Sequence, residues 1–271
     1  MKQPWMMKNA AIDRERTTVM GIVNVTPDSF SDGGRYFDPD QAVAHALSMQ
    51  DEGADIIDIG GQSTRPGSKT LDAREELARI EPVIAALRGR LRVPLSIDTF
   101  YPEVAERALQ LGADIVNDVS GRADPTMAAV VAQTGAGWIL TETLGNYRED
   151  IAGDVAERLR RLASQAQDCG VKQESVCLDP GFGFEKDAAQ NVALMHGLDR
   201  VSALDYPLLA GVSRKRFIGA LTGVEQADER DPGTLAAHLL CLQKGACIIR
   251  AHNVPMSLQM ARVWDGYRGA F

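Results

Sequence analysis

The sequence predicts a single α/β domain folded as a (β/α)8 barrel. The chain has 271 residues, 45% of them hydrophobic and 24% charged, which is the composition of an ordinary globular protein. Eight short apolar runs alternate with eight amphipathic segments, the pattern of parallel strands covered by helices on both faces. Eight such units in about 250 residues match the size of a closed barrel. A doubly wound open sheet is the alternative fold.

The strands are expected where branched apolar residues run between turn signals. The first run is interrupted only by Asn24, and the polar loop after it contains Pro27 and the pair Gly33-Gly34. The eight expected strands cover 19–25, 54–61, 94–99, 114–118, 137–143, 176–179, 207–212 and 246–251.

Helices are expected between the strands, where apolar residues recur with a helical period and caps mark the ends. Asp38 and Asp72 are N-cap candidates, while Gly53, Gly112 and Gly245 end three of the segments. The expected helices cover 38–52, 72–90, 102–111, 125–134, 151–169, 190–201, 232–244 and 256–267.

The amino-terminal residues differ from the rest of the chain. Residues 1–16 are polar and lack a clear period, so we expect an N-terminal extension that is poorly ordered or covers an edge. The barrel domain is then expected over 17–271, because no low-complexity linker or break in composition divides that range.

Net charge and cysteine usage restrict the class of protein. The formal net charge is −8, which argues against nucleic acid as the main partner. No apolar run approaches the ~20 residues that span a bilayer, so no membrane partner is expected, and no secretory signal is visible. Cys169, Cys177, Cys241 and Cys247 form no C-x-x-C pair and are expected to be reduced, as in a cytoplasmic protein.

Polar side chains recur at the carboxyl ends of the expected strands. Barrels of this kind carry their active sites on the loops after the strands. One polar residue at a strand end can simply satisfy loop amides, but a series at successive strands is difficult to explain in that way. We therefore expect the series to converge on one mouth. It consists of Asn24, Asp58, Asp98, Asn117, Glu142, Asp179, Ser213-Arg214-Lys215, Arg250 and His252.

The mixture of charges indicates the kind of ligand. Carboxylates and amides gather at the third, fourth and sixth strands, where they suit a flat heterocycle with several N–H donors. Lys215, Arg250 and His252 suit a leaving phosphate or diphosphate. Phe182 or Phe184 can stack on the ring, although core packing is the more frequent role of a single phenylalanine. No cluster of metal ligands is visible, but a Mg²⁺ ion held mostly by substrate phosphates would leave little trace in a sequence.

Five segments of the chain resemble dihydropteroate synthase. They are residues 20–34 (MGIVNVTPDSFSDGG), 60–67 (GGQSTRPG), 178–184 (LDPGFGF), 211–219 (GVSRKRFIG) and 249–252 (IRAH). The combination is highly specific, although no single segment would be, and the resemblance extends from Val19 to about Arg262. It implies a TIM barrel that joins 6-hydroxymethyl-7,8-dihydropterin diphosphate to p-aminobenzoate, releasing diphosphate and making 7,8-dihydropteroate in folate synthesis.

The resemblance also implies a mechanism and a pterin site. Diphosphate would leave first, a pterin cation would form, and loops at about 27–37 and 62–72 would close over the site. The implied catalytic residues are Asp98, Lys215, Arg250 and His252. The implied pterin-binding residues are Asp98, Asn117, Asp179, Phe184 and Lys215.

The second substrate and the leaving group have their own implied residues. The p-aminobenzoate pocket would consist of Phe30, Thr64, Arg65, Pro66 and Arg216. The diphosphate would be held by Asn24, Thr64, Arg65, Arg250 and His252. Mg²⁺ is the implied cofactor, with Asn24 as its protein ligand. The family commonly forms homodimers through late helices, where this chain offers Leu239, Leu240, Leu258 and Met260.

Departures from the family pattern leave other functions open. The usual Met-His after the fifth strand is Thr141-Glu142, which adds a carboxylate either to the mouth or to a contact between helix and barrel. The usual Glu before Ser-Thr-Arg-Pro is Gln62, and the usual Asp after His252 is Asn253. A catalytically silent pterin-binding paralogue is therefore an alternative. A pterin-dependent methyltransferase is a second one, although it would not need the cations after the last two strands.

Overall fold

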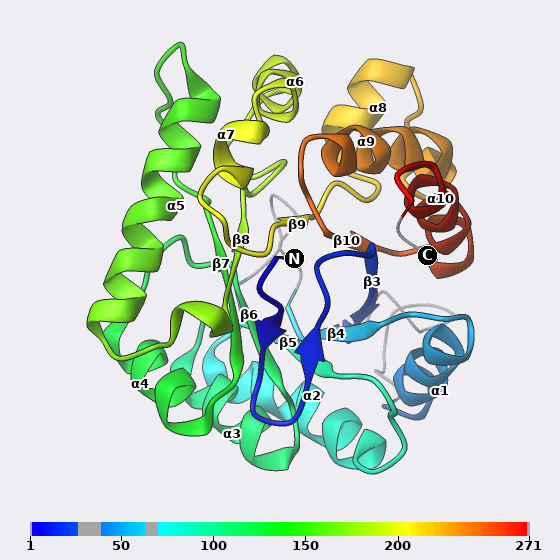
Figure 1. The fold of residues 1–271 in the computed structure, drawn as a ribbon. Coiled ribbons are helices and arrows are strands. Elements are labelled where there is room, and N and C mark those ends of the chain that lie inside the picture. Colours follow the sequence, from blue (N-terminus) through cyan, green and yellow to red (C-terminus); the bar gives the residue numbers. More distant parts are fainter. Residues whose placement is uncertain (1, 27–38, 63–69, 270–271) are drawn as a thin grey trace.

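The computed structural model of the chain describes residues 2–26, 39–62 and 70–269. Within these ranges, eight parallel strands form one sheet in the order β8-β7-β6-β5-β4-β3-β10-β9. An isolated parallel bridge between Leu178 and Leu208 joins the two ends of that sheet and closes it. Helices surround the closed sheet (Figure 1). The expected (β/α)8 barrel is confirmed, and the doubly wound open sheet is excluded.

The barrel strands are short and almost wholly buried, as the apolar runs predict. All of them match their expected ranges to within two residues at each end. The strand expected over 207–212 is reduced to two residues, because Leu208 pairs only through the isolated bridge. The strands are β3 (Thr18–Asn24), β4 (Ile56–Gly60), β5 (Leu95–Asp98), β6 (Ile115–Asp118), β7 (Gly137–Thr141), β8 (Val176–Asp179), β9 (Leu209–Ala210) and β10 (Ile248–Ala251).

The helices form the outer layer of the molecule (Figure 1). They are α1 (Pro39–Asp51), α2 (Ala73–Leu87), α3 (Pro102–Leu111), α4 (Pro125–Thr134), α5 (Ile151–Asp168), α6 (Ala188–His196), α7 (Asp199–Ser202), α8 (Arg216–Thr222), α9 (Asp231–Gln243) and α10 (Val254–Tyr267). The capping role of Asp72 is confirmed, since its Oδ1 accepts from the amide of Glu75 at 2.8 Å. Asp38 lies outside the described residues.

Two expectations about the helices were wrong. The helix expected over 190–201 is divided into α6 and α7 at Gly197. A side chain at Gly197 would lie 2.5 Å from the Cβ of Ala152, so the glycine permits close packing against α5. The expected helices did not include α8, which begins directly after Lys215, and Gly223 ends it with a positive φ of 75°.

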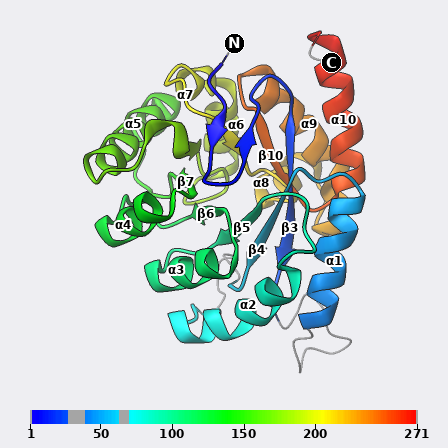
Figure 2. The same cartoon turned by 60° about the horizontal axis from the view of Figure 1, so that its bottom comes forward.

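An amino-terminal hairpin closes one end of the barrel. Its strands, β1 (Trp5–Met6) and β2 (Ala11–Ile12), are antiparallel and lie across that end in Figure 2. Trp5 is fully buried, and its Nε1 donates to the carbonyl oxygen of Ser175 at 2.9 Å. Of the two possibilities for residues 1–16, poor order does not hold for the hairpin, whereas a covering role does: it packs against inward-facing residues of the barrel strands, among them Met20, Ile56, Ile115 and Ile139.

Two features of the outer layer bear on the chemistry of the chain. One concerns membranes: within the described residues, no helix combines the length and the apolar character that a membrane span requires. The other concerns a buried histidine. His238 on α9 is completely buried. Burial disfavours the charged imidazolium and lowers the pKa of His238 to about 4.

The neutral form of His238 makes the fold sensitive to acid. Its pKa is about 4 in the folded chain, against the ordinary value of 6.5 for the unfolded chain, so only the unfolded state takes up the proton between these values. The neutral imidazole therefore contributes fully to the free energy of unfolding above pH 6.5. As the pH falls towards 4 this contribution is lost, and the free energy of unfolding drops by about 2 kcal/mol between pH 7 and pH 5. We expect His238→Gln to remove this part of the pH dependence in urea unfolding experiments. The exposed His196, changed to Gln, serves as the control, and equal pH dependence in all three proteins would contradict the assignment.

Candidate active site

A layer of polar residues crosses the carboxyl ends of the strands. The parallel register places Asn24 beside Gly60, Gly60 beside Asp98, and Asp98 beside Asn117. Asp179 ends β8 in the same way and pairs with Thr141 of β7. This is the end of the barrel opposite the hairpin, and in parallel barrels it is the end at which sites form.

An ion cluster forms the centre of this layer. Nε of Arg250 donates to Oδ2 of Asp58 at 2.7 Å, and Nη2 donates to Oδ2 of Asp98 at 2.8 Å. Nδ2 of Asn117 donates to the same oxygen of Asp58 at 3.1 Å. Asp58 is completely buried, so its charge requires such a counterion. The cluster thereby links β4, β5, β6 and β10 across the mouth.

Several buried acceptors around the cluster have no partner in the described part of the chain. They are Oδ1 of Asp58, Oδ1 of Asn117, Oγ of Ser96 and Oγ1 of Thr141. A buried polar atom left unpaired costs about 1–3 kcal/mol, and such atoms normally bind water or a ligand. Carboxylate and amide oxygens accept hydrogen bonds, so the mouth is suited to a ligand that carries N–H groups.

The pKa values of three charged groups in the mouth are shifted in the direction that favours their neutral forms. Burial raises the pKa of Asp98 to about 7, against the opposing effect of Arg250. Burial also raises the pKa of Asp179, although the amide of Gly181 donates to its Oδ1 at 2.8 Å. Burial lowers the pKa of Lys215 to about 8, with Asp179 acting in the opposite direction. Groups that titrate near pH 7 in a buried cluster are typical of catalytic sites.

Lys215 and Phe184 form one wall of the mouth. Nζ of Lys215 donates to the carbonyl oxygen of Phe182 and lies 4.2 Å from the centroid of the Phe184 ring. Phe184 is partly exposed, so its ring can contact a ligand. Phe182 is completely buried and stacks on Phe217 with ring centroids 6.4 Å apart. The choice between the two phenylalanines, which the sequence leaves open, is thus settled by burial: Phe182 is a core residue.

The loops after β9 and β10 hold each other. Oγ of Ser213 and Nδ1 of His252 are 2.9 Å apart, and the amide of His252 donates to the same hydroxyl at 3.2 Å. Arg214 has a positive φ of 57°, which is rare for a residue with a side chain. Its guanidinium turns to α9, where it makes a bidentate pair with Asp231 at 2.7 and 2.8 Å.

Asn253 joins the same pair. Its Oδ1 accepts from the amide of Met256 and caps α10, while its Nδ2 donates to Oδ2 of Asp231 at 3.0 Å. Asp231 loses solvation by burial, but its hydrogen bonds with Arg214 and Asn253 outweigh that loss and hold its pKa below the ordinary value. An aspartate at 253 would place a second carboxylate against the first, so the amide at this position suits the local charge.

We expect the chain to tolerate exchange of the carboxylate at 231 and the amide at 253 only when both residues are changed together. Asn253→Asp alone sets two carboxylates against each other, and Asp231→Asn alone leaves Arg214 without its counterion. Each change should lower the free energy of unfolding by about 1–3 kcal/mol, while the double variant recovers most of that loss. Urea unfolding of the four proteins measures the coupling, and simple additivity of the two losses would contradict it.

The structure brings most of the site residues expected from the sequence to one end of the barrel. Asp98, Asn117, Asp179, Lys215 and Arg250 surround the mouth, as the ion cluster and the mutual effects on pKa show. His252 is bonded to Ser213 at the same end. Asn24 ends β3, and Arg216 is the exposed first residue of α8. The remaining expected residues lie outside the described part of the chain: Phe30, Thr64, Arg65 and Pro66. The roles of all these residues stay predictions.

Three residues gained importance only from the structure. Asp58 was expected at a strand end without a role, although a lone aspartate inside an isoleucine run was its signal. Ser213 was likewise expected at a strand end without a role, and Lys186 had no assignment at all. Glu142, for which two positions were open, lies in a contact between helix and barrel: its carboxylate accepts from Arg158 of α5 at 3.0 Å and from Lys186 at 2.9 Å.

Comparisons with known proteins show the family of the chain. The family model described as "Pterin binding enzyme" matches residues 20–252. The dihydropteroate synthase of Bacillus subtilis is 44% identical over 255 residues, which cover 93% of this chain and 89% of that protein. The dihydropteroate synthase of Clostridium beijerinckii is 42% identical over 93% of this chain and 94% of that protein.

Solved structures show the same relationship. A Xanthomonas albilineans dihydropteroate synthase with 4-aminobenzoic acid superposes with a TM-score of 0.94 at 41% identity, covering 99% of both chains. The enzyme of that organism in complex with 7,8-dihydropteroate superposes with a TM-score of 0.88, also at 41% identity, covering 95% of this chain and 96% of that one. The chain belongs to the dihydropteroate synthase family of pterin-binding enzymes.

Proposed function

We propose that the chain catalyses the condensation of 6-hydroxymethyl-7,8-dihydropterin diphosphate with p-aminobenzoate, a transferase reaction that releases diphosphate in folate biosynthesis. The observation that carries this proposal is the cluster of unpaired acceptors beside a buried cation. Oδ1 of Asp58 and Oδ1 of Asn117 can accept the ring N–H groups of a pterin. Lys215, partly protonated around pH 8, can donate to a ring oxygen.

Charge in the mouth favours a dissociative reaction. An ionised Asp98 would stabilise positive charge that develops on the pterin, and its pKa of about 7 keeps that ionised form accessible at neutral pH. The guanidinium of Arg250 has five N–H donors, and its contacts with Asp58 and Asp98 use two of them. The others remain able to bind the departing diphosphate, together with His252 on the next loop.

Mg²⁺ would accompany the diphosphate. Within the described residues, no group of three His, Cys, Asp or Glu side chains is arranged to hold a metal ion. A hard cation that takes most of its oxygen ligands from phosphate and water fits this arrangement, and it needs few protein ligands. Asn24 at the end of β3 would supply one amide oxygen. When bound, Mg²⁺ neutralises charge on the leaving group.

The amine substrate and the cellular location complete the proposal. Phe30, Thr64, Arg65, Pro66 and Arg216 would form the p-aminobenzoate pocket, and Arg216 stands exposed at the start of α8, directly after Lys215. Thr64 and Arg65 would also contact the diphosphate. The cytoplasm would be the site of the reaction, which the four free cysteines support.

Turnover should depend on Lys215. We expect purified protein to release diphosphate from the pterin substrate in a Mg²⁺-dependent reaction and, when p-aminobenzoate is present, to form 7,8-dihydropteroate in equal amount. Lys215→Met removes the partly buried cation and should lower kcat/KM at least about a hundredfold, whereas Lys172→Met at an exposed position should have no effect. Pterin binding without diphosphate release would favour the silent paralogue instead.

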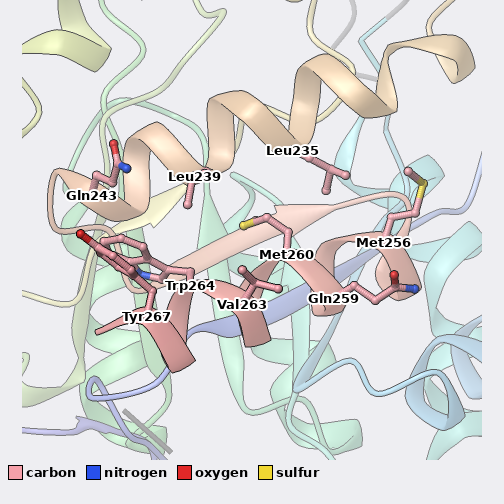
Figure 3. A pocket seen from close by; sticks show the side chains of 9 residues that line it. All are labelled: Leu235, Leu239, Gln243, Met256, Gln259, Met260, Val263, Trp264 and Tyr267. Atoms are coloured by element: carbon pink, nitrogen blue, oxygen red, sulfur yellow. The ribbon is translucent and has the colours of Figure 1, made fainter. Parts of the chain in front are cut away.

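A second copy of the chain is the proposed partner. An apolar groove of about 480 Å³ lies between α9 and α10, and Figure 3 shows Leu239, Met260 and Val263 within it. Val263 and Tyr267 are 74% and 83% exposed, and the exposed Leu240 and Met256 belong to the same two helices. A concentration of exposed apolar side chains of this kind marks an interaction surface. A two-fold arrangement would bury the same face of both copies and leave the mouths open.

The homodimer can be tested by charging this face. Val263→Glu places a carboxylate in the groove and should convert the dimer into a monomer in light-scattering measurements of mass. Val192→Glu on α6, an apolar residue that is 43% exposed, is the matched control and should stay dimeric. A monomeric mass for the unaltered chain would refute the proposed partner.

A further inference from the structure

Glu142 is buried among four hydrogen-bond donors just beyond β7. Its side chain is 1% exposed. Oε1 accepts from the amide of Leu144 and from Nη1 of Arg158, both at 3.0 Å. Oε2 accepts from the hydroxyl of Tyr147 at 2.7 Å and from Nζ of Lys186 at 2.9 Å. All of its contacts therefore lie behind the mouth and none within it.

Lys186 connects this carboxylate to the loop that follows β8. Its side chain is completely buried, and its Nζ also donates to the carbonyl oxygens of Gly181 at 3.1 Å and Phe184 at 3.3 Å. The three protons of the ammonium group are thus used, one on Glu142 and two on the ends of the loop 181–184. The ring of Tyr147 covers Nζ at 4.7 Å from its centroid.

The same loop carries three contacts that shape the mouth. The amide of Gly181 donates to Asp179, the carbonyl oxygen of Phe182 accepts from Lys215, and the ring of Phe184 lies against the Lys215 ammonium. Gly181 has a positive φ of 68°, and a Cβ there would lie 1.7 Å from the carbonyl oxygen of Glu142. The loop therefore packs directly on the backbone of residue 142, and neither can move alone.

We propose that Glu142 and Lys186 are positioning residues for the pterin ring. Through the loop 181–184 they fix where the Lys215 ammonium, the Asp179 carboxylate and the Phe184 ring stand. This inference rests on the proposed function, because it concerns the substrate of that site. It assigns Glu142 and Lys186 to pterin binding although neither side chain touches the mouth.

Electrostatics explains why both partners are needed. A buried ammonium group is stable only beside an opposite charge, and removing one partner of such a pair leaves the other uncompensated. Burial lowers the pKa of Lys186, and Glu142 opposes that effect. Without Glu142, Lys186 would lose its proton or leave its site, and the two loop carbonyls would lose their donor.

The inference predicts a selective loss of pterin affinity. Glu142→Ala and Lys186→Met should each raise the KM for the pterin diphosphate, and the Kd for a 6-hydroxymethylpterin in calorimetry, about tenfold or more. The KM for p-aminobenzoate should change less than about twofold. If the two residues act as a unit, the double variant should be no worse than the poorer single variant.

The control is a buried carboxylate whose hydrogen bonds do not reach the loop. Asp154 on α5 is 4% exposed and pairs with Arg148, which is 81% exposed, so Asp154→Asn lowers stability without removing a contact of the loop 181–184. Its pterin affinity should stay unchanged. If Glu142→Ala does not fold, Glu142→Gln and Lys186→Met carry the same test.

The two proposals can fail separately. If the unaltered chain binds the pterin and all variants bind it equally well, the positioning role is refuted while the proposed function stands. If the unaltered chain binds no pterin in calorimetry, the proposed function is refuted and the positioning role with it.

Discussion

The pairing of Arg250 with Asp58 and Asp98 is the interaction on which the rest of the molecule depends. It spans 192 residues of sequence and connects the last strand of the barrel to two of the early ones. A carboxylate as deeply buried as Asp58 is tolerated only with a counterion, so closure of the barrel and neutralisation of its mouth are one event. The cluster also acts on Lys215, because Arg250 lowers the pKa of the ammonium group while Asp98 raises it.

The barrel and the centre of its site could be predicted from the sequence because both follow from regular periods. Once strands of a parallel sheet are recognised, their carboxyl ends must meet, and residues such as Asp98, Asn117 and Arg250 are brought together without knowledge of any loop. The register of the parallel strands also brings Asn24 to this end of the barrel, two strands away from Asp98.

Residues beyond the strand ends were not predictable in this way, because a loop can turn a side chain in any direction. Glu142 follows β7 directly, yet its carboxylate is held behind the mouth by the amide of Leu144 and by Arg158 of α5. Arg214 belongs to the cationic motif, yet its positive φ turns it to α9. Phe182 and Phe184 have equal standing in the sequence, and only the turns at Gly181 and Gly183 give them opposite environments. The hairpin at Trp5 likewise depends on tertiary contacts that have no local signal.

The hairpin also decides which end of the barrel a ligand can use. Trp5 and Met7 are buried in the amino-terminal end of the barrel, so its axis is no passage. A molecule that enters at the carboxyl ends of the strands has to leave through the same mouth. In a reaction with two substrates and two products, a product anion and an incoming amine would therefore have to use one opening, and slow departure of the anion would delay entry of the amine.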